Sequence, residues 1–243
     1  MKILSLNAGY FLGYDGTLSD YIRHPLRGFL GDSAIQSKRV DRFTRLVKEI
    51  EPDTVLLQEV DQGSIRSTRV SRPEEVSRQL SDGFEAFAAT KYCGWVNSLP
   101  FLGKMSNAIV YREGKLKNHY LETGRKSLVQ EISLEGYSIF SVHLARFGSA
   151  VRHNQIKELE KILHERDEYV VAGDFNFHNK GEAQQASDVL KAEASTDGET
   201  FPVENPRKTL DMAFSSKGLD LDVEVLDRKI SDHRPLVIDV GKA

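Results

Sequence analysis

Carboxylate, amide and imidazole side chains recur in this sequence at the ends of short apolar runs. They are Asn7, Glu59, His143, Asp174, Asn176, Asp211, Asp232 and His233. Carboxylate and amide oxygens bind hard divalent cations, and an imidazole can move a proton or donate a hydrogen bond to an anion. Such a set can neutralise the charge of a phosphate, activate a water molecule and assist the leaving oxygen. The residue types therefore indicate hydrolysis of a phosphate ester.

Glu59 is the leading candidate for a metal ligand, and Asn7 is a partner for it through its amide oxygen. Glu59 follows the apolar run Thr54–Leu57, and Asn7 follows the run Lys2–Leu6. A hard ion such as magnesium prefers oxygen ligands and keeps much of its water shell. A surface carboxylate that caps a strand end would give the same local sequence, so both interpretations of Glu59 stay open.

The stretch Gly173–Asn176 is a second candidate, because an apolar strand, Tyr169–Ala172, leads directly into it. The glycine permits close approach of the backbone, and Asp174 and Asn176 point to the same side of an extended chain. Asp174 could orient or deprotonate an attacking water, and Asn176 could hydrogen-bond a phosphate. The same residues favour a turn, so a plain turn between strand and loop is the competing interpretation.

Two histidines differ from the others because they stand beside apolar strands. His233 lies in Ser231–Pro235, immediately before the last strand, and His143 ends an alternating strand. An imidazolium beside a phosphate needs an acceptor for its other nitrogen, and Asp211 is the candidate for that role. Asp232 could help to hold a metal ion or a water molecule.

Basic and aromatic side chains near these residues bear on the substrate. Arg66, Arg69 and Arg72 recur at every third residue after Glu59, and guanidinium groups match phosphate oxygens. We assign Arg66 and Arg69 to substrate binding, although a solvated basic face explains the spacing slightly better. The segment Tyr10–Ala34 interleaves aromatic and cationic groups, which could stack bases, contact a lipid interface or cover the edge of a sheet.

The elements that must position these residues are mostly strands. Apolar patterns predict strands at Lys2–Leu6, Thr54–Leu57, Phe84–Ala89, Asn107–Arg112, Ser127–Leu134, Tyr137–Leu144, Tyr169–Ala172, Leu210–Ser215, Leu221–Leu226 and Leu236–Val240. Helical spacing predicts helices at Ile35–Ile50, Pro73–Leu80 and Val151–His164. From Asn7 to about Ala34 the pattern indicates a long irregular segment. This order favours two packed sheets covered by helices, an α/β (α+β) sandwich with the polar residues converging at one edge.

Composition limits the class of protein. The 243 residues are 40% hydrophobic and contain no break rich in Pro, Gly or Ser, so we expect one domain over residues 1–243. A net charge of -3 argues against nonspecific coating of nucleic acid but not against a nuclease. The single cysteine, Cys93, excludes an intrachain disulfide and a zinc site with several cysteines. Without a long apolar run or a signal peptide, we expect no stable membrane insertion and a cytoplasmic location, and no protein partner can be inferred.

Taken in order, these stretches resemble the endonuclease/exonuclease/phosphatase superfamily, which includes pancreatic-type deoxyribonucleases, abasic-site endonucleases, neutral sphingomyelinases and inositol polyphosphate phosphatases. The matching stretches are Leu6-Asn7, Leu57-Gln58-Glu59-Val60, Val142-His143-Leu144, Gly173-Asp174-Phe175-Asn176, Thr209-Leu210-Asp211-Met212-Ala213-Phe214 and Ser231-Asp232-His233-Arg234-Pro235. Each stretch alone is weak, but together they stand in the family order and span nearly the whole chain.

The resemblance implies a four-layer α/β sandwich of two packed, mainly antiparallel β-sheets flanked by helices. It implies magnesium, or manganese, at Glu59 with Asn7 and Asp232. It also implies that Asp174 and Asn176 handle the nucleophile and the phosphate, that His143 and His233 stabilise the transition state, and that Asp211 orients His233. The sequence departs from abasic-site endonucleases in having Leu6 before Asn7 instead of Trp, and His143 where those enzymes have Tyr. Both departures point away from abasic-site repair.

We therefore expect a divalent-metal-dependent hydrolase of phosphate esters, either a phosphodiesterase or a phosphatase. A DNA or RNA nuclease is the second hypothesis, motivated by the resemblance and by the arginines that follow Glu59. A catalytically silent module that binds a phosphorylated ligand is the third, although binding alone does not require both histidines and both Asp174 and Asp232. The substrate stays open among nucleic acid, a lipid head group and a small phosphate ester.

Overall fold

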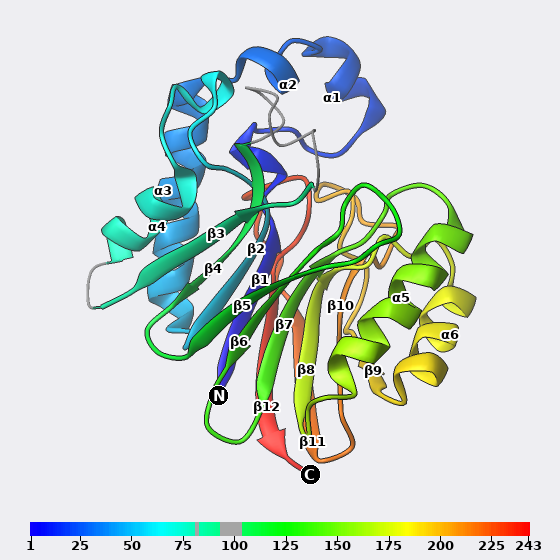
Figure 1. The fold of residues 1–243 in the computed structure, drawn as a ribbon. Coiled ribbons are helices and arrows are strands. Elements are labelled where there is room, and N and C mark those ends of the chain that lie inside the picture. Colours follow the sequence, from blue (N-terminus) through cyan, green and yellow to red (C-terminus); the bar gives the residue numbers. More distant parts are fainter. Residues whose placement is uncertain (81–82, 93–103) are drawn as a thin grey trace.

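Two six-stranded β-sheets pack face to face, and helices cover both outer faces (Figure 1). The computed structural model describes residues 1–80, 83–92 and 104–243, and Cys93 lies outside the described residues. The succession of helix, sheet, sheet and helix confirms the predicted four-layer α/β sandwich.

Each sheet combines one parallel pair of strands with antiparallel neighbours. The first sheet has the order β11 (Leu219–Val225), β12 (Leu236–Lys242), β1 (Lys2–Asn7), β2 (Thr54–Asp61), β4 (Met105–Tyr111) and β3 (Glu85–Thr90). The second has the order β5 (Lys115–Tyr120), β6 (Leu128–Ser133), β7 (Ser138–His143), β8 (Tyr169–Asp174), β10 (Asp211–Ser215) and β9 (Glu193–Ser195). The parallel pairs are β1 with β2 and β7 with β8. The other described pairs are antiparallel, so the sheets are mixed but mainly antiparallel.

Three apolar layers hold the sandwich together. Along β1, Ile3 lies in the layer between the sheets, whereas Leu4 and Leu6 lie in the layer under α3 (Ser33–Ile50) and α4 (Arg72–Leu80). The alternation follows from the two-residue period of an extended chain. A third layer lies between the second sheet and the helices α5 (Ser149–Leu163) and α6 (Lys180–Leu190). Because both faces of the central strands are covered, their sequences read as continuous apolar runs.

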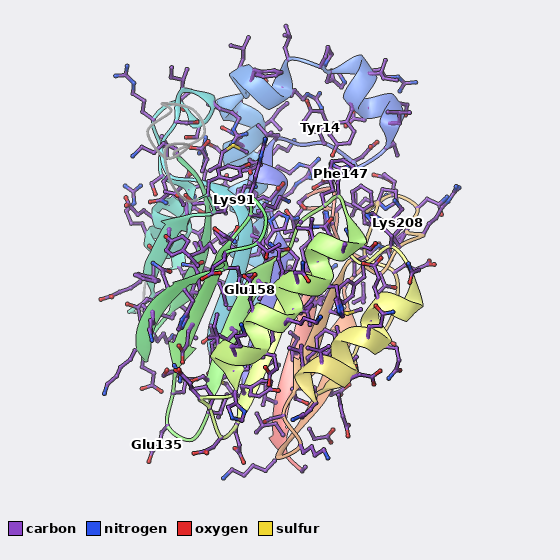
Figure 2. The ribbon with its side chains drawn as sticks, turned by 45° about the vertical axis from the view of Figure 1, so that its right-hand side comes forward. Tyr14, Lys91, Glu135, Phe147, Glu158 and Lys208 are labelled. Atoms are coloured by element: carbon purple, nitrogen blue, oxygen red, sulfur yellow. The ribbon has the colours of Figure 1, made fainter. Side chains whose placement is uncertain are left out.

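The pairing of the central strands decides where the polar residues lie. Asn7 pairs with Gln58 at the end of the β1–β2 ladder, and Asp174 pairs with both His143 and Asp211 in the second sheet. The segment 8–34 covers this end of the sandwich, and both chain termini lie at the other end (Figure 1). Figure 2 shows Tyr14, Phe147 and Lys208 at the covered end and Glu135, in the β6–β7 hairpin, at the opposite end.

The segment from Asn7 to Ala34 is not a long irregular stretch, as the sequence pattern had indicated. It contains the 3-10 turn η1 (Gly9–Phe11) and the short helices α1 (Leu18–Arg23) and α2 (Arg27–Leu30). Neither short helix buries a residue, so neither has the apolar stripe on which sequence-based prediction of a helix depends. In the described part of the chain, no helix has both the length and the apolar character needed to cross a membrane.

The strands β5 and β9 and the helix α6 were not predicted, nor was the 3-10 turn η2 (Ile65–Ser67). The strands β5 and β9 lie at the two edges of the second sheet. The sequence of β5, Lys-Leu-Lys-Asn-His-Tyr, is mostly polar, and β9 has only three residues. The helix α6 carries a glycine and small residues in place of a strong apolar stripe. In each case the tertiary pairing partner stabilises an element whose own sequence pattern is weak.

The strands β7 and β8 approach each other closely at Gly173, immediately before Asp174. The φ of Gly173 is +140°, and an added Cβ would lie 2.2 Å from the carbonyl oxygen of Val142. We expect Gly173→Ala to lower the free energy of unfolding by about 2–4 kcal/mol, because the two strands must separate or take up strain.

Gly136→Ala is the matched control for that substitution. Its φ is +96°, but no atom lies within 4 Å of the added Cβ, so we expect a loss of only about 1 kcal/mol. Equilibrium unfolding in urea measures both variants. Equal losses would show that the approach of Gly173 to Val142 imposes no steric constraint.

Candidate active site

Polar side chains from both sheets line a cavity of about 80 Å³ at the end of the sandwich that residues 8–34 cover. The lining includes Asn7, Glu59, His143, Asp174, Asn176, Asp232 and His233. Asp211 is outside this lining and contacts His233. The structure therefore brings together the residues that the sequence analysis selected as catalytic or metal-binding.

Asp174 is buried in the wall of this cavity and is held by several donors. Asn7 Nδ2 donates to Asp174 Oδ2 at 2.8 Å, and the backbone N–H of Asn176 donates to Oδ1 at 2.9 Å. His143 Nε2 lies 3.4 Å from Oδ2. Burial and, after it, the negative charge of Asp211 raise the pKa of Asp174 to about 6. A carboxylate with a raised pKa is suited to accept a proton near neutral pH.

His233 is paired with Asp211. Its Nδ1 lies 2.7 Å from Asp211 Oδ2, which also accepts a hydrogen bond from Thr200 Oγ1 at 2.6 Å. Burial by itself lowers the pKa of His233, but the charge and hydrogen bond of Asp211 outweigh burial and raise the pKa to about 10. His233 is therefore an imidazolium that donates through Nδ1. The ring of Phe201 packs against the imidazole with 4.9 Å between centroids.

A β-bulge sets the position of Glu59. The strand β2 does not end at Leu57, as the sequence pattern had predicted, but continues to Asp61. Its register against β4 shifts between Leu57 and Val60, and Glu59 has a left-handed φ of +52°. The backbone N–H of Glu59 donates to Asn107 Oδ1 at 3.2 Å. Because a bulge re-aims a side chain, the carboxylate of Glu59 reaches the cavity from within a strand.

Two lysines hold the Glu59 carboxylate. Lys91 Nζ donates to Glu59 Oε1 at 2.9 Å, and Lys126 Nζ lies 3.6 Å from the same oxygen. Burial raises the pKa of Glu59, but the charges of Lys91, Lys126 and His143 outweigh it and hold the pKa well below its ordinary value. Lys91 is buried 4.8 Å from the centre of the Tyr10 ring, and burial lowers its pKa to about 8 although Glu59 opposes the shift.

His143 differs from His233 in its protonation state. Its Nε2 contacts Lys126 Nζ and lies 3.9 Å from Glu59 Oε1. Burial and, after it, the positive charge of Lys126 hold the pKa of His143 well below its ordinary value, so the ring is neutral. The two histidines therefore offer the cavity one neutral and one charged imidazole.

Asp232 connects the site to the segment that covers it. Its Oδ2 accepts a hydrogen bond from the Tyr21 hydroxyl of α1 at 3.0 Å, and Ser231 Oγ lies 3.3 Å from its Oδ1. The backbone of Gly9 also packs closely here, because a Cβ added at Gly9 would lie 2.4 Å from Asp232 Oδ1. The position of α1 and the position of this carboxylate thus depend on each other.

The donor set suits a divalent cation. Oxygen donors of Asn7, Glu59 and Asp232 line the cavity, and hard cations take carboxylate and amide oxygens as ligands. A second group is buried beside them: potential ligand atoms of Asp174, Asp211 and His233 all lie within 4.8 Å of one another. In that second group His233 is protonated and donates to Asp211, so its ring has no lone pair to bind a cation. The oxygen atoms of Asn7, Glu59 and Asp232 are therefore the better ligands.

The arginines selected as substrate ligands lie elsewhere. Arg66 is buried, its Nη2 lies 3.0 Å from Asp61 Oδ2, and its guanidinium stacks 3.8 Å from the centre of the Tyr10 ring. Arg69 is exposed and belongs neither to the cavity lining nor to this stack. Arg72 pairs with Glu75. The structure therefore does not bring Arg66 or Arg69 into the lining, and their role in substrate binding stays a prediction.

Several residues of the site were missed in the sequence. They are Tyr21, Lys91, Lys126, Arg146, His178 and Lys208. Lys91 directly follows β3, so the same search for polar residues at strand ends could have found it. Lys126 and Lys208 lie in loops, and no local sequence signal marked them. Tyr21 belongs to the segment Tyr10–Ala34, which the sequence marked by its aromatic and cationic groups but not as part of the metal site.

Comparisons with known proteins agree with the fold. A model of the endonuclease/exonuclease/phosphatase family matches residues 26–233. A search of curated protein sequences found no relative of this chain. Among solved structures, an endonuclease/exonuclease/phosphatase family protein from Leptotrichia buccalis is similar with a TM-score of 0.71 and 17% identity, over 99% of each chain.

Two further structures are similar at lower identity. The mannosyl-6-phosphatase of Bacteroides thetaiotaomicron has a TM-score of 0.63 and 15% identity, over 99% of each chain. TDP2 of D. rerio, complexed with a single-strand DNA product, has a TM-score of 0.66 and 13% identity, over 99% of this chain and 98% of that one. At these identities the likeness concerns the fold. Since the family model covers most of the sequence, this protein belongs to the endonuclease/exonuclease/phosphatase family.

Proposed function

We propose that this protein hydrolyses phosphate esters with the help of a divalent metal ion, magnesium or manganese. The family to which it belongs acts on phosphoester bonds. The observation that carries the proposal is the convergence of three differently charged groups on one cavity: an anionic Glu59, an Asp174 with a raised pKa and a protonated His233. Groups whose environments drive their pKa values apart are typical of acid and base pairs in catalysis.

We assign the metal ion to Glu59, with Asn7 and Asp232 as further oxygen ligands. A divalent cation at this position polarises the phosphoryl group and neutralises the charge that develops on it. Lys91 and Lys126 keep the Glu59 carboxylate charged and oriented. Tyr21 orients Asp232 through its hydroxyl group.

Asp174 is the proposed general base. Asn7 fixes one of its carboxylate oxygens and the backbone N–H of Asn176 fixes the other, so the carboxylate cannot rotate freely. Its raised pKa favours acceptance of the proton of an attacking water.

The remaining polar groups are proposed to bind the phosphate. His233 keeps Nδ1 on Asp211, which leaves its Nε2–H for a phosphoryl oxygen. Asn176 donates one amide hydrogen to the carbonyl oxygen of Leu144 and retains a second for the substrate. His143, neutral and buried, adds a hydrogen-bonding group without adding charge.

The first test is turnover by wild type, Asp174→Asn and His233→Ala with magnesium. The substrates are bis(p-nitrophenyl) phosphate, p-nitrophenyl phosphate and a panel of sugar phosphates, nucleotides and lipid phosphodiesters. We expect each variant to lose a factor of about 10²–10⁴ in kcat, because it loses an acid-base or electrostatic group.

Circular dichroism and urea unfolding show whether these variants keep the fold. A folded variant with a normal rate would remove its residue from the mechanism. Tight binding of phosphate compounds without turnover of any, unchanged in Asp174→Asn, would instead support a silent binding module.

A nuclease is favoured by one further observation. Arg146 and Lys208 line the cavity, and within the described residues neither cation has a carboxylate within 4.0 Å. Cations without acidic partners suit a phosphodiester backbone. We expect magnesium-dependent nicking of supercoiled plasmid by wild type and none by Glu59→Ala. The variant is also the control for contamination, because nicking in its preparation would reveal a contaminating nuclease. Intact plasmid with both proteins would direct the search to smaller phosphate esters.

Removing the Glu59 charge should weaken metal binding. We expect Glu59→Gln to raise the dissociation constant for Mn²⁺ by about tenfold or more, because a neutral amide replaces a carboxylate ligand. The signal of free Mn²⁺ in electron paramagnetic resonance measures this directly, independently of activity. Glu135→Gln, in the hairpin at the opposite end of the sandwich, is the control. Unchanged affinity in Glu59→Gln would place the ion elsewhere, with Asp174, Asp211 and His233 as the next candidates.

The pairing of Lys91 with Glu59 has a consequence for stability. We expect Lys91→Met to lower the free energy of unfolding by about 2–4 kcal/mol, because it leaves the Glu59 carboxylate short of a buried partner. The double variant Lys91→Met/Glu59→Gln should recover much of this loss. Urea unfolding of the two single variants and the double variant completes the cycle. Additive losses would show that the two charges do not interact.

A further inference from the structure

A second cavity adjoins the candidate active site. Its volume is about 320 Å³, and it shares two lining residues, His178 and Lys208, with the first cavity. The other lining residues come from α6, from the loop before it and from the segment 196–212. Because two side chains line both cavities, the cavities lie side by side, within the reach of one bound molecule.

The loop that borders the second cavity is tied to the catalytic histidine. Phe201, whose ring packs on His233, forms a β-bridge with Lys208. The backbone N–H groups of Arg207 and Lys208 both donate to the carbonyl oxygen of Phe201, at 2.9 and 3.0 Å. Thr200, one residue earlier, donates to Asp211. The backbone that carries Arg207 and Lys208 therefore has a defined position relative to the proposed phosphate site.

The side chains on this loop carry positive charge that other residues do not neutralise. Within the described part of the chain, neither Arg207 nor Lys208 forms an ion pair or a side-chain hydrogen bond. Nearby Arg234, in contrast, pairs with Asp227 at 2.9 Å. Glu199 contributes the only carboxylate among the described lining residues. The rim of the second cavity therefore has a surplus of positive charge.

The inner wall of the second cavity is apolar. Phe177 and Met212 are buried side chains of this wall, and Ala183 of α6 lies beside them. Phe177 also packs on Phe175 with 5.4 Å between ring centroids, which fixes its position. A wall of this kind suits the uncharged organic part of a ligand, while a cationic rim suits an anionic group attached to it.

We propose that the second cavity binds a second phosphate group of the substrate, with Arg207 and Lys208 as its ligands and the wall at Phe177 and Met212 in contact with the organic part between the two phosphates. This inference rests on the proposed function, because the first phosphate must occupy the candidate active site. The preferred substrate is therefore an organic molecule that carries at least two phosphate groups. The next phosphate of an oligonucleotide and the second phosphate of a small bisphosphorylated compound share this chemistry.

Binding can be tested separately from turnover. Isothermal titration of Asp174→Asn in saturating magnesium would compare the dinucleotide TpT with its 5′- and 3′-phosphorylated forms, and glucose 6-phosphate with glucose 1,6-bisphosphate. We expect a second phosphate to tighten binding by about tenfold in at least one of the two series, as one added charge-assisted contact gives. The series that responds identifies the source of the second phosphate.

Variants of the second cavity assign the effect to it. Arg207 lines only the second cavity, so we expect Arg207→Gln to remove most of the gain from the second phosphate and to leave binding of the singly phosphorylated compounds unchanged. Glu199→Gln should increase the gain, because it removes a repulsive charge. Arg228→Gln is the control, because Arg228 lines a groove that shares no lining residue with either cavity.

The results distinguish a failure of the second phosphate site from a failure of the proposed function. Equal affinity for compounds with one and two phosphates, no binding of any bisphosphate, or a gain that Arg207→Gln leaves intact would overturn the second phosphate site. Wild-type turnover is measured on the same compounds. Selective binding of bisphosphates with no hydrolysis by wild type would support the second site and count against the proposed function. Hydrolysis of singly and doubly phosphorylated compounds at equal kcat/KM would support the function and reject the site.

Discussion

Mutual repulsion among closely spaced carboxylates, two of them buried, is the constraint on which this end of the molecule depends. Glu59, Asp174 and Asp232 line one small cavity, and Asp211 adjoins it. Charges of like sign in a poorly solvated space are costly unless cations and hydrogen-bond donors offset them. The lysines beside Glu59 and the imidazolium beside Asp211 supply that compensation. Because the compensation is uneven, the pKa of Glu59 falls while that of Asp174 rises, and the carboxylates become suited to different tasks.

The backbone departs from regular geometry where these side chains need it. Glu59 lies in a bulge with a left-handed φ, and Asn176, two residues after the end of β8, has a φ of +53°. Gly173 lets two strands approach more closely than a side chain would permit. Irregular backbone of this kind persists only when rigid surroundings hold it. Here the apolar layers on both faces of the central strands provide the rigidity.

Two segments outside the central strands contact the candidate site. The segment 8–34 contacts the site through Tyr21, and the segment 196–212 contacts it through Thr200 and Phe201. Residues 8–34 and 196–210 lie outside the two sheets and contact groups that we assign to catalysis or metal binding (Figure 1). Loops on a rigid scaffold can change without loss of the core. A common chemistry can therefore accompany different substrates within one fold.

The sequence by itself determined the buried strands, the helices α3, α4 and α5, and the set of polar residues at strand ends. Those features follow from local periodicity and from residue chemistry, and both can be read from the sequence without knowledge of the tertiary contacts. Tertiary structure decided the rest. The short helices α1 and α2 and the edge strands β5 and β9 have no apolar stripe of their own, and only packing or pairing partners define them. Lys91 and Lys126 lie in the site because strands that are distant in the sequence converge there. Arg66 is buried because it forms an ion pair with Asp61 and stacks on the ring of Tyr10. Spacing along the chain cannot distinguish a solvated arginine from a buried one. A buried arginine is stabilised by partners that come close to it only after folding.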